Sequence, residues 1–166
     1  MTDPTPLFQE TQRFRQLWLW TLMLALIVLA FCAIASAFTQ NRSPAAAAFT
    51  AGMWAVFGLG IPVLLMITRL VVEVRPNELR CRFFPFHLRP RVFDTKTIVK
   101  CMPCEYRPLR DFGGWGIRKG FGSKGWAYNV SGALGVQLVF KDGRKLLIGS
   151  QRPEELALAI LDSARH

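Results

Sequence analysis

Two long runs without charged side chains dominate the first half of the chain. The first covers residues 16–41 and the second covers residues 43–68, with 26 positions in each. As α-helices with a rise of 1.5 Å per residue, each run would be about 39 Å long, whereas the hydrocarbon core of a bilayer is about 30 Å thick. The pattern therefore predicts two transmembrane helices, about 17–38 and 45–69, which form an antiparallel hairpin within residues 16–69.

Two other interpretations of these runs are open. Two apolar helices could be buried in a soluble core, but a far larger protein would be needed to cover them. The first run could instead be a cleaved signal peptide, because Arg13 and Arg15 precede it and Ala35-Ser36-Ala37 resembles a cleavage site. The run is longer than a usual signal core, so we favour the transmembrane hairpin.

The distribution of cations predicts the orientation of this hairpin. The short loop between the two runs carries one cation, Arg42. Cations are more frequent at the other ends, where Arg13 and Arg15 precede the first run and Arg69, Arg75, Arg80, Arg82, Arg89 and Arg91 follow the second. Because Lys and Arg concentrate on the cytoplasmic side, we expect both termini in the cytoplasm and residues 1–15 as a cytoplasmic segment. Neither run contains Asp, Glu, Lys, Arg or His, which favours an anchor over a transporter.

The second half of the chain shows the period of short β-strands. In residues 79–83, alternation places Arg80 and Arg82 on one face and Leu79, Cys81 and Phe83 on the other. Asp142-Gly143 between two apolar runs predicts a β-hairpin of residues 134–140 with 144–149.

After residue 149 the period becomes helical and predicts a C-terminal helix over 152–164, with Leu156 and Ile160 buried. We therefore expect an α+β membrane protein. In it, residues 70–166 form a cytoplasmic domain, a small antiparallel β-barrel or sandwich of about seven strands closed by the helix.

Two segments resemble a known group of proteins. They are the Gly143-Arg144 turn that leads into residues 148–156, Ile-Gly-Ser-Gln-Arg-Pro-Glu-Glu-Leu, and the stretch of residues 112–118 followed by Ala127-Tyr128-Asn129. Together with the preceding hairpin, they resemble the bacterial pleckstrin-homology-like domain membrane proteins. The resemblance implies a fold and a location, the inner membrane of a bacterium, rather than an activity.

Composition agrees with a basic protein at a membrane. Apolar residues make up 51% of the chain and charged ones only 19%, against about 25% in an average soluble domain, and the net charge is +10. Cations just past a span attract anionic headgroups by roughly 1 kcal/mol each. Arg75, Arg80 and Arg82 are therefore the candidate lipid-binding residues, with the alternative that they only set the topology.

Candidate chemistry is sparse. Cys101 and Cys104 form a C-x-x-C pair, and Cys81 and His87 precede it in the chain. Such a set could bind a metal or act in redox chemistry. However, residues i and i+3 of a strand point to opposite faces, which argues against a shared site. We expect reduced thiols and no cofactor. Residues 120–125 match G-x-G-x-x-G, but a strand-like segment follows, so we expect a loop between strands rather than a nucleotide site. The common catalytic motifs are absent, which favours a protein that is not an enzyme.

These observations lead to two hypotheses about function. The first is a membrane-anchored, non-catalytic interaction module that binds a protein partner or anionic lipid at the cytoplasmic face, and that does not bind nucleic acid. The second is a sensor or accessory subunit of a membrane complex, in which the glycine-rich middle and the cysteines bind a small ligand or a metal.

Overall fold

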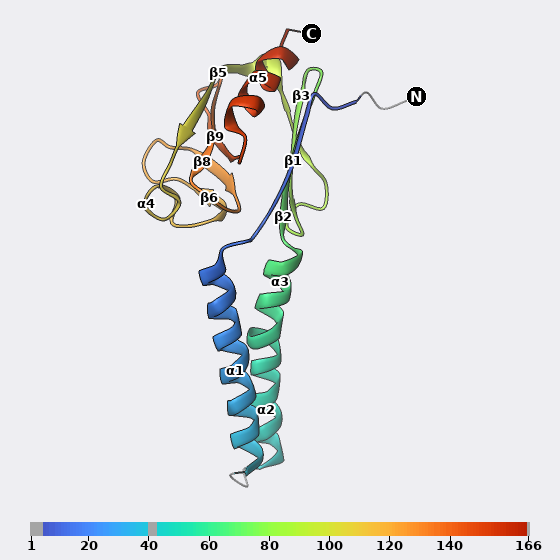
Figure 1. Cartoon of the computed structure of the whole chain (residues 1–166), viewed down its shortest axis with the longest axis vertical. Coiled ribbons are helices and arrows are strands. Elements are labelled where there is room, and N and C mark those ends of the chain that lie inside the picture. Colours follow the sequence, from blue (N-terminus) through green and yellow to red (C-terminus); the bar gives the residue numbers. More distant parts are fainter. Residues whose placement is uncertain (1–4, 40–42, 166) are drawn as a thin grey trace. The chain divides into compact units, whose positions relative to one another are not determined.

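The computed structural model describes residues 5–39 and 43–165, which divide into two compact units (Figure 1). One unit is the apolar segment Phe14–Ile67. The other combines the residues before it, up to Arg13, with those from Thr68 onward. A single compact unit is thus built from both sides of the apolar segment.

The apolar unit is helical throughout its described length. Helix α1 covers Leu17–Thr39, and a second helical stretch continues through α2 (Pro44–Trp54), the π-helix η1 (Ala55–Gly60) and α3 (Ile61–Ile67). Two long apolar helices are confirmed, although Arg69 belongs to the following strand. Ser43 caps α2, since its hydroxyl accepts a hydrogen bond from the Ala46 amide at 3.3 Å. The predicted loop residue Arg42 lies outside the described residues.

The π-helical turns have a local cause and allow close packing. Pro62 has no amide hydrogen to donate to the carbonyl of Gly58, so the regular α-helical ladder is interrupted there. A Cβ atom at Gly58 would lie 2.9 Å from the Cβ of Ala30. Only small residues allow the two helices to approach this closely, which agrees with the many Ala and Gly residues in both runs.

The other unit contains two sheets. Sheet A has the order β1 (Phe8–Arg13), β2 (Arg69–Arg75), β3 (Glu78–Phe84), β4 (Arg91–Asp94). Sheet B has the order β5 (Ile98–Glu105), β8 (Leu134–Phe140), β9 (Lys145–Gly149), β7 (Trp126–Asn129), β6 (Gly116–Lys119). The short helices η2 (Thr95–Thr97) and α4 (Pro108–Phe112) and the C-terminal helix α5 (Pro153–Ser163) complete the unit.

The α+β class and most of the elements follow the sequence pattern. Strands β8 and β9 pair antiparallel, and β3 buries Leu79, Cys81 and Phe83 on one face. The described residues form nine strands rather than about seven, and β7 pairs parallel with β9 in a sheet that was expected to be antiparallel. Strand β1 was not predicted, because two of its three inward positions are polar, Glu10 and Gln12.

Helix α5 packs against strands of both sheets and completes the core (Figure 1). Leu156 and Ile160 are buried, as the sequence predicts. Cys101 of β5 lies against the backbone of this helix, and Ser163 donates a hydrogen bond to the carbonyl of Arg75 in β2 at 2.5 Å. The helix therefore holds the two sheets together through apolar contacts and backbone hydrogen bonds.

Strand β1 is held from two sides. It pairs antiparallel with β2 over its whole length, from Phe8 opposite Val74 to Arg13 opposite Arg69. The buried Gln12 amide donates to the carbonyl of Gly149 at 2.6 Å. The Glu10 carboxylate accepts from the Ser150 hydroxyl at 2.6 Å and from the Gln151 amide at 2.8 Å. Polar side chains of the N-terminal strand therefore satisfy polar groups at the C-terminal end of β9 and in the two residues that follow it.

Replacing Gln12 tests this attachment. We expect Gln12→Ala to lower the free energy of unfolding by about 1–3 kcal/mol, because the buried carbonyl of Gly149 loses its donor. Gln9→Ala is the matched control, since Gln9 lies on the same strand with an exposed side chain. Urea unfolding of the purified chain in detergent measures both changes, and equal effects would contradict the role assigned to Gln12.

Candidate functional site

The outer face of sheet A carries cations at the end where β1 finishes and β2 begins. Arg13 lies opposite Arg69, and Arg69 lies opposite Phe84 of β3. The guanidinium groups of Arg69 and Arg82 stand over the Phe84 ring, with their central carbons 5.4 and 5.6 Å from its centroid. We call Arg13, Arg69 and Arg82 the basic end of sheet A.

The three candidate lipid-binding residues do not form one cluster. Arg75 is six residues along β2 from Arg69, about 20 Å away at 3.3 Å per residue. It pairs with Glu73 at 2.6 Å, and Arg80 pairs with Glu78 at 2.8 Å. Arg82 belongs to the basic end, and among the described residues no carboxylate lies within ion-pair distance of it.

A cavity of about 170 Å³ lies beside Arg69 and Arg82 of the basic end and beside Arg80. It is lined by Arg69, Val71, Glu73, Arg80, Arg82 and Pro90. In the sequence, Arg13 and Arg69 are only cations that flank the apolar runs. Their pairing across β1 and β2 shows that they share a surface with Arg82, and only the unexpected strand β1 reveals this.

The cysteines lie in separate environments. Cys81 is on β3 of sheet A, whereas Cys101 and Cys104 are on β5. Cys101 contacts the carbonyl of Ala157 in α5, and Cys104 packs against the apolar cluster of Tyr106 and Phe112. In the described part of the chain, no group of three or more His, Cys, Asp or Glu residues is placed to hold a metal ion.

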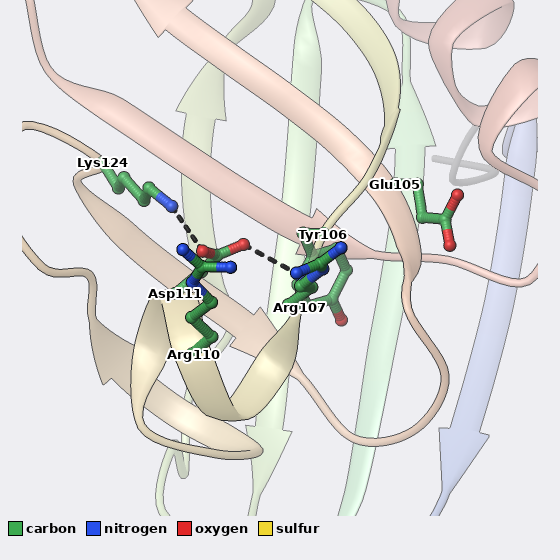
Figure 2. A pocket seen from close by; sticks show the side chains of 6 residues that line it. All are labelled: Glu105, Tyr106, Arg107, Arg110, Asp111 and Lys124. Carbon is green, nitrogen blue, oxygen red and sulfur yellow. Dashed lines mark hydrogen bonds and ion pairs between the residues drawn. The ribbon is translucent and has the colours of Figure 1, made fainter.

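A second candidate site lies beside helix α4 (Figure 2). Its cavity of about 570 Å³ is lined by Glu105, Tyr106, Arg107, Arg110, Asp111 and Lys124. The Asp111 carboxylate accepts hydrogen bonds from the Lys124 ammonium at 2.5 Å and from the Arg107 amide at 2.9 Å. Figure 2 shows the Glu105 carboxylate pointing away from this group. Three cations therefore surround one carboxylate, which leaves an excess of positive charge.

The ionisation of this site follows from its contacts. The hydrogen bond from Lys124, helped by the Arg107 amide, holds the pKa of Asp111 below its usual value, so its carboxylate is charged at neutral pH. Burial raises the pKa of Tyr106 to about 12, so its phenol is neutral. The site can thus bind a small anion through its cations, beside a charged carboxylate and a neutral phenol.

The glycine-rich segment contributes Lys124 to this site. Residues 120–125 connect β6 to β7 as a loop between strands, as the sequence predicts, and the Gly120 amide donates to the Gly125 carbonyl at 2.7 Å. Gly125 has a φ of +80°, and a Cβ atom there would collide with the carbonyl of Lys145. The glycines therefore serve a tight connection that places Lys124 next to Asp111.

Together these features define an α+β protein in which two paired strands flank a long apolar helical hairpin. A family model matches residues 7–165, which include β1, both apolar helices and α5. The chain belongs to this family, which is described as a family of unknown function (DUF6141). No curated protein matches the chain.

Thiol reactivity tests the placement of the cysteines. Burial raises the pKa of Cys81 to about 12 and that of Cys101 to about 11, so both remain protonated thiols at pH 8. In variants that keep one cysteine each, we expect Cys81 to react with iodoacetamide far more slowly than a cysteine introduced by Glu154→Cys, whose position is exposed outside the apolar helices. Unfolding should remove the difference. Rapid reaction of Cys81 in the folded chain would contradict its buried position.

Proposed function

We propose that this chain is an integral protein of the bacterial inner membrane. In this proposal, α1 and the α2–α3 stretch span the bilayer, and the unit built from β1 and the residues after Ile67 is a non-catalytic interaction module at the cytoplasmic face. The basic end of sheet A binds anionic lipid. The two sheets and the closing C-terminal helix agree with the pleckstrin-homology-like resemblance of the sequence, which is part of the same proposal.

The pairing of β1 with β2 is the observation that carries the proposal. Because Arg13 and Arg69 are partners in one sheet, the chain returns after the apolar helices to the place where it left. Such a chain can cross a membrane only an even number of times. The pairing therefore supports two spans with both flanking segments on one side, and the cation bias favours the cytoplasm.

The surface of the helices supports insertion into lipid. Both are long and apolar enough to cross a bilayer, and most of their side chains are exposed, including Leu24, Phe31, Phe49 and Met66. Exposed apolar area in water costs about 25 cal/mol per Å², and lipid removes this cost. A buried core helix would have shown the opposite pattern of exposure.

The attachment of β1 argues against a cleaved signal peptide. Cleavage after Ala37 would remove the whole of β1 from sheet A. Strand β2 would then become an edge strand, and the buried carbonyl of Gly149 would lose the Gln12 amide. An uncleaved N-terminus keeps both interactions.

Chain connectivity supports lipid contact at the basic end. Only Thr68 separates Ile67 from Arg69, so Arg69 lies within about 7 Å of the end of α3 even in an extended chain. This distance is comparable to the Debye length of about 8 Å at physiological salt. Arg69 is therefore favoured for headgroup contact, whereas Arg75 lies about 20 Å further along β2.

Cysteine accessibility tests the topology. In cells of a bacterial expression host, we expect Ser43→Cys to react with a membrane-impermeant maleimide added from outside, and Glu154→Cys to react only after the membrane is permeabilised. Both residues are exposed, so the membrane alone should cause the difference. Labelling of Glu154→Cys in intact cells would overturn the proposed orientation.

The orientation of the module in nanodiscs tests lipid binding. With a dye at Glu154→Cys and an acceptor on the lipid headgroups, we expect energy transfer to differ between neutral and anionic lipid, and the difference to shrink at high salt. The double variant R69Q/R82Q should lose most of the difference. R144Q/R165Q is the matched control, because it removes the same charge from exposed positions elsewhere. If the first variant behaves like the parent chain, these arginines only set the topology.

The cavity beside α4 favours a second candidate function, the binding of a small anionic ligand. Its support is the excess of cations from Arg107, Arg110 and Lys124 over the Asp111 carboxylate in one cavity. This gives the sensor hypothesis a site made of arginine and lysine, the groups that bind phosphate and carboxylate.

Inorganic phosphate is a direct probe of this second function. We expect phosphate to raise the unfolding temperature of the parent chain in a saturable way, since a ligand that binds only the folded state stabilises it. R110Q/K124Q should lose the effect, and K141Q/R144Q, two exposed cations in the β8–β9 turn, should keep it. Equal responses of the two variants would exclude the cavity as the binding site.

A further inference from the structure

The loop between β3 and β4, residues 85–90, presents two large apolar side chains to solvent. Phe86 is 61% exposed and Leu88 is 78% exposed. The exposed cations Arg89 and Arg91 follow directly. Single exposed apolar residues are ordinary, but two within three positions, beside cations, are typical of segments that enter the interface of a membrane.

The loop is held in place by the rest of the unit. The Phe86 ring contacts that of Phe83, with 5.9 Å between centroids, and the His87 ring packs edge-on against Tyr128 at 5.6 Å. The His87 amide donates to the carbonyl of Phe83 at 2.7 Å, and Arg82 donates to the carbonyl of His87 at 3.4 Å. A preordered loop loses little conformational entropy when its apolar side chains are transferred into another phase.

The loop does not add an unpaired imidazolium charge. Burial and the neighbouring Arg91 lower the pKa of His87, so its ring is neutral at pH 7. The positive charge around the loop therefore comes from Arg82, Arg89 and Arg91, whose long side chains can extend toward phosphate groups while the apolar tips are buried.

The position of the loop in sheet A identifies its occupant as a lipid surface. The loop starts directly after Phe84, which is the partner of Arg69, and only Thr68 separates Arg69 from α3. If the helices span a bilayer, the loop starts next to the residue that leaves the hydrocarbon. This connectivity favours a lipid surface over a soluble protein as the occupant.

We propose that Phe86 and Leu88 insert into the boundary between headgroups and acyl chains of the same membrane that holds the helical hairpin, while Arg82, Arg89 and Arg91 bind the lipid phosphates. This inference rests on the proposed function and deepens it: the module has an apolar contact with the bilayer in addition to the electrostatic one. Unlike the contact of the cations, insertion of the apolar side chains does not weaken at high salt.

Quenching by spin-labelled lipids tests the insertion. The full chain, with Cys101 and Cys104 replaced by Ser and the buried Cys81 retained, carries one environment-sensitive dye in nanodiscs of mixed phosphatidylcholine and phosphatidylglycerol. In one variant the dye is attached to the native Cys32. In two others Cys32 is also replaced by Ser, and the dye is attached to Phe86→Cys or to Phe121→Cys. Phe121 is the matched control, because it is 65% exposed in the loop between β6 and β7.

We expect nitroxides near the headgroup to quench the dye at position 86 several-fold more than the dye at position 121. Equal quenching at the two positions would overturn the inference while leaving the hairpin intact. Quenching of the Cys32 dye by nitroxides deep in the bilayer tests the span separately. Its absence would overturn the proposed function and the insertion with it.

A second measurement distinguishes insertion of the apolar side chains from electrostatic binding by the arginines. In the energy-transfer assay, F86S/L88S should lower the energy transfer that remains at high salt, whereas L109S/F121S, which changes residues of similar exposure, should leave it unchanged. If both double variants retain the residual transfer, the apolar side chains do not insert.

Discussion

Hydrogen bonds between β1 and β2 join two parts of the chain that are separated by the whole apolar hairpin. Adjacent antiparallel strands are usually linked by a short turn, but here the connection is Phe14–Thr68. This pairing decides which residues share the sheet, where the helices leave it, and why the segment before the first helix belongs to the same compact unit as the C-terminal helix. A hairpin inserted between paired strands must return to its starting point, whatever surrounds its apolar surface.

Buried polar groups make this pairing specific. The inward side chains Glu10 and Gln12 of β1 contact Gly149–Gln151, where they satisfy backbone and hydroxyl groups that would otherwise lack partners. Leaving such groups unpaired costs more than the net gain of an ordinary hydrogen bond, so alternative registers of β1 are disfavoured. A one-residue shift would also move Phe8 from the core to the outer face.

The same register distributes charge along the outer face of sheet A. At one end, Arg13 and Arg69 lie in one row with Phe84; at the other end, Arg75 lies in one row with two carboxylates, Glu78 and Asp94. Arginines that stack on an aromatic ring keep their charge and their hydrogen-bonding capacity, whereas those beside carboxylates are largely neutralised. The electrostatic character of the sheet therefore changes along its strands, and a count of arginines does not reveal this.

The sequence by itself determined the two apolar helices, the alternation of β3, the β8–β9 hairpin, the glycine-rich loop and the C-terminal helix. Each depends on a local period or a turn dipeptide that acts over a few residues. Only the tertiary structure decided the place of β1, because its inward side chains are polar and their partners at Gly149–Gln151 lie about 140 positions away. The parallel β7–β9 pair, the separation of Arg75 from Arg82, and the grouping of Arg107, Arg110 and Lys124 were decided in the same way. Long-range pairing sets these neighbours, and it leaves no periodic signal in the chain.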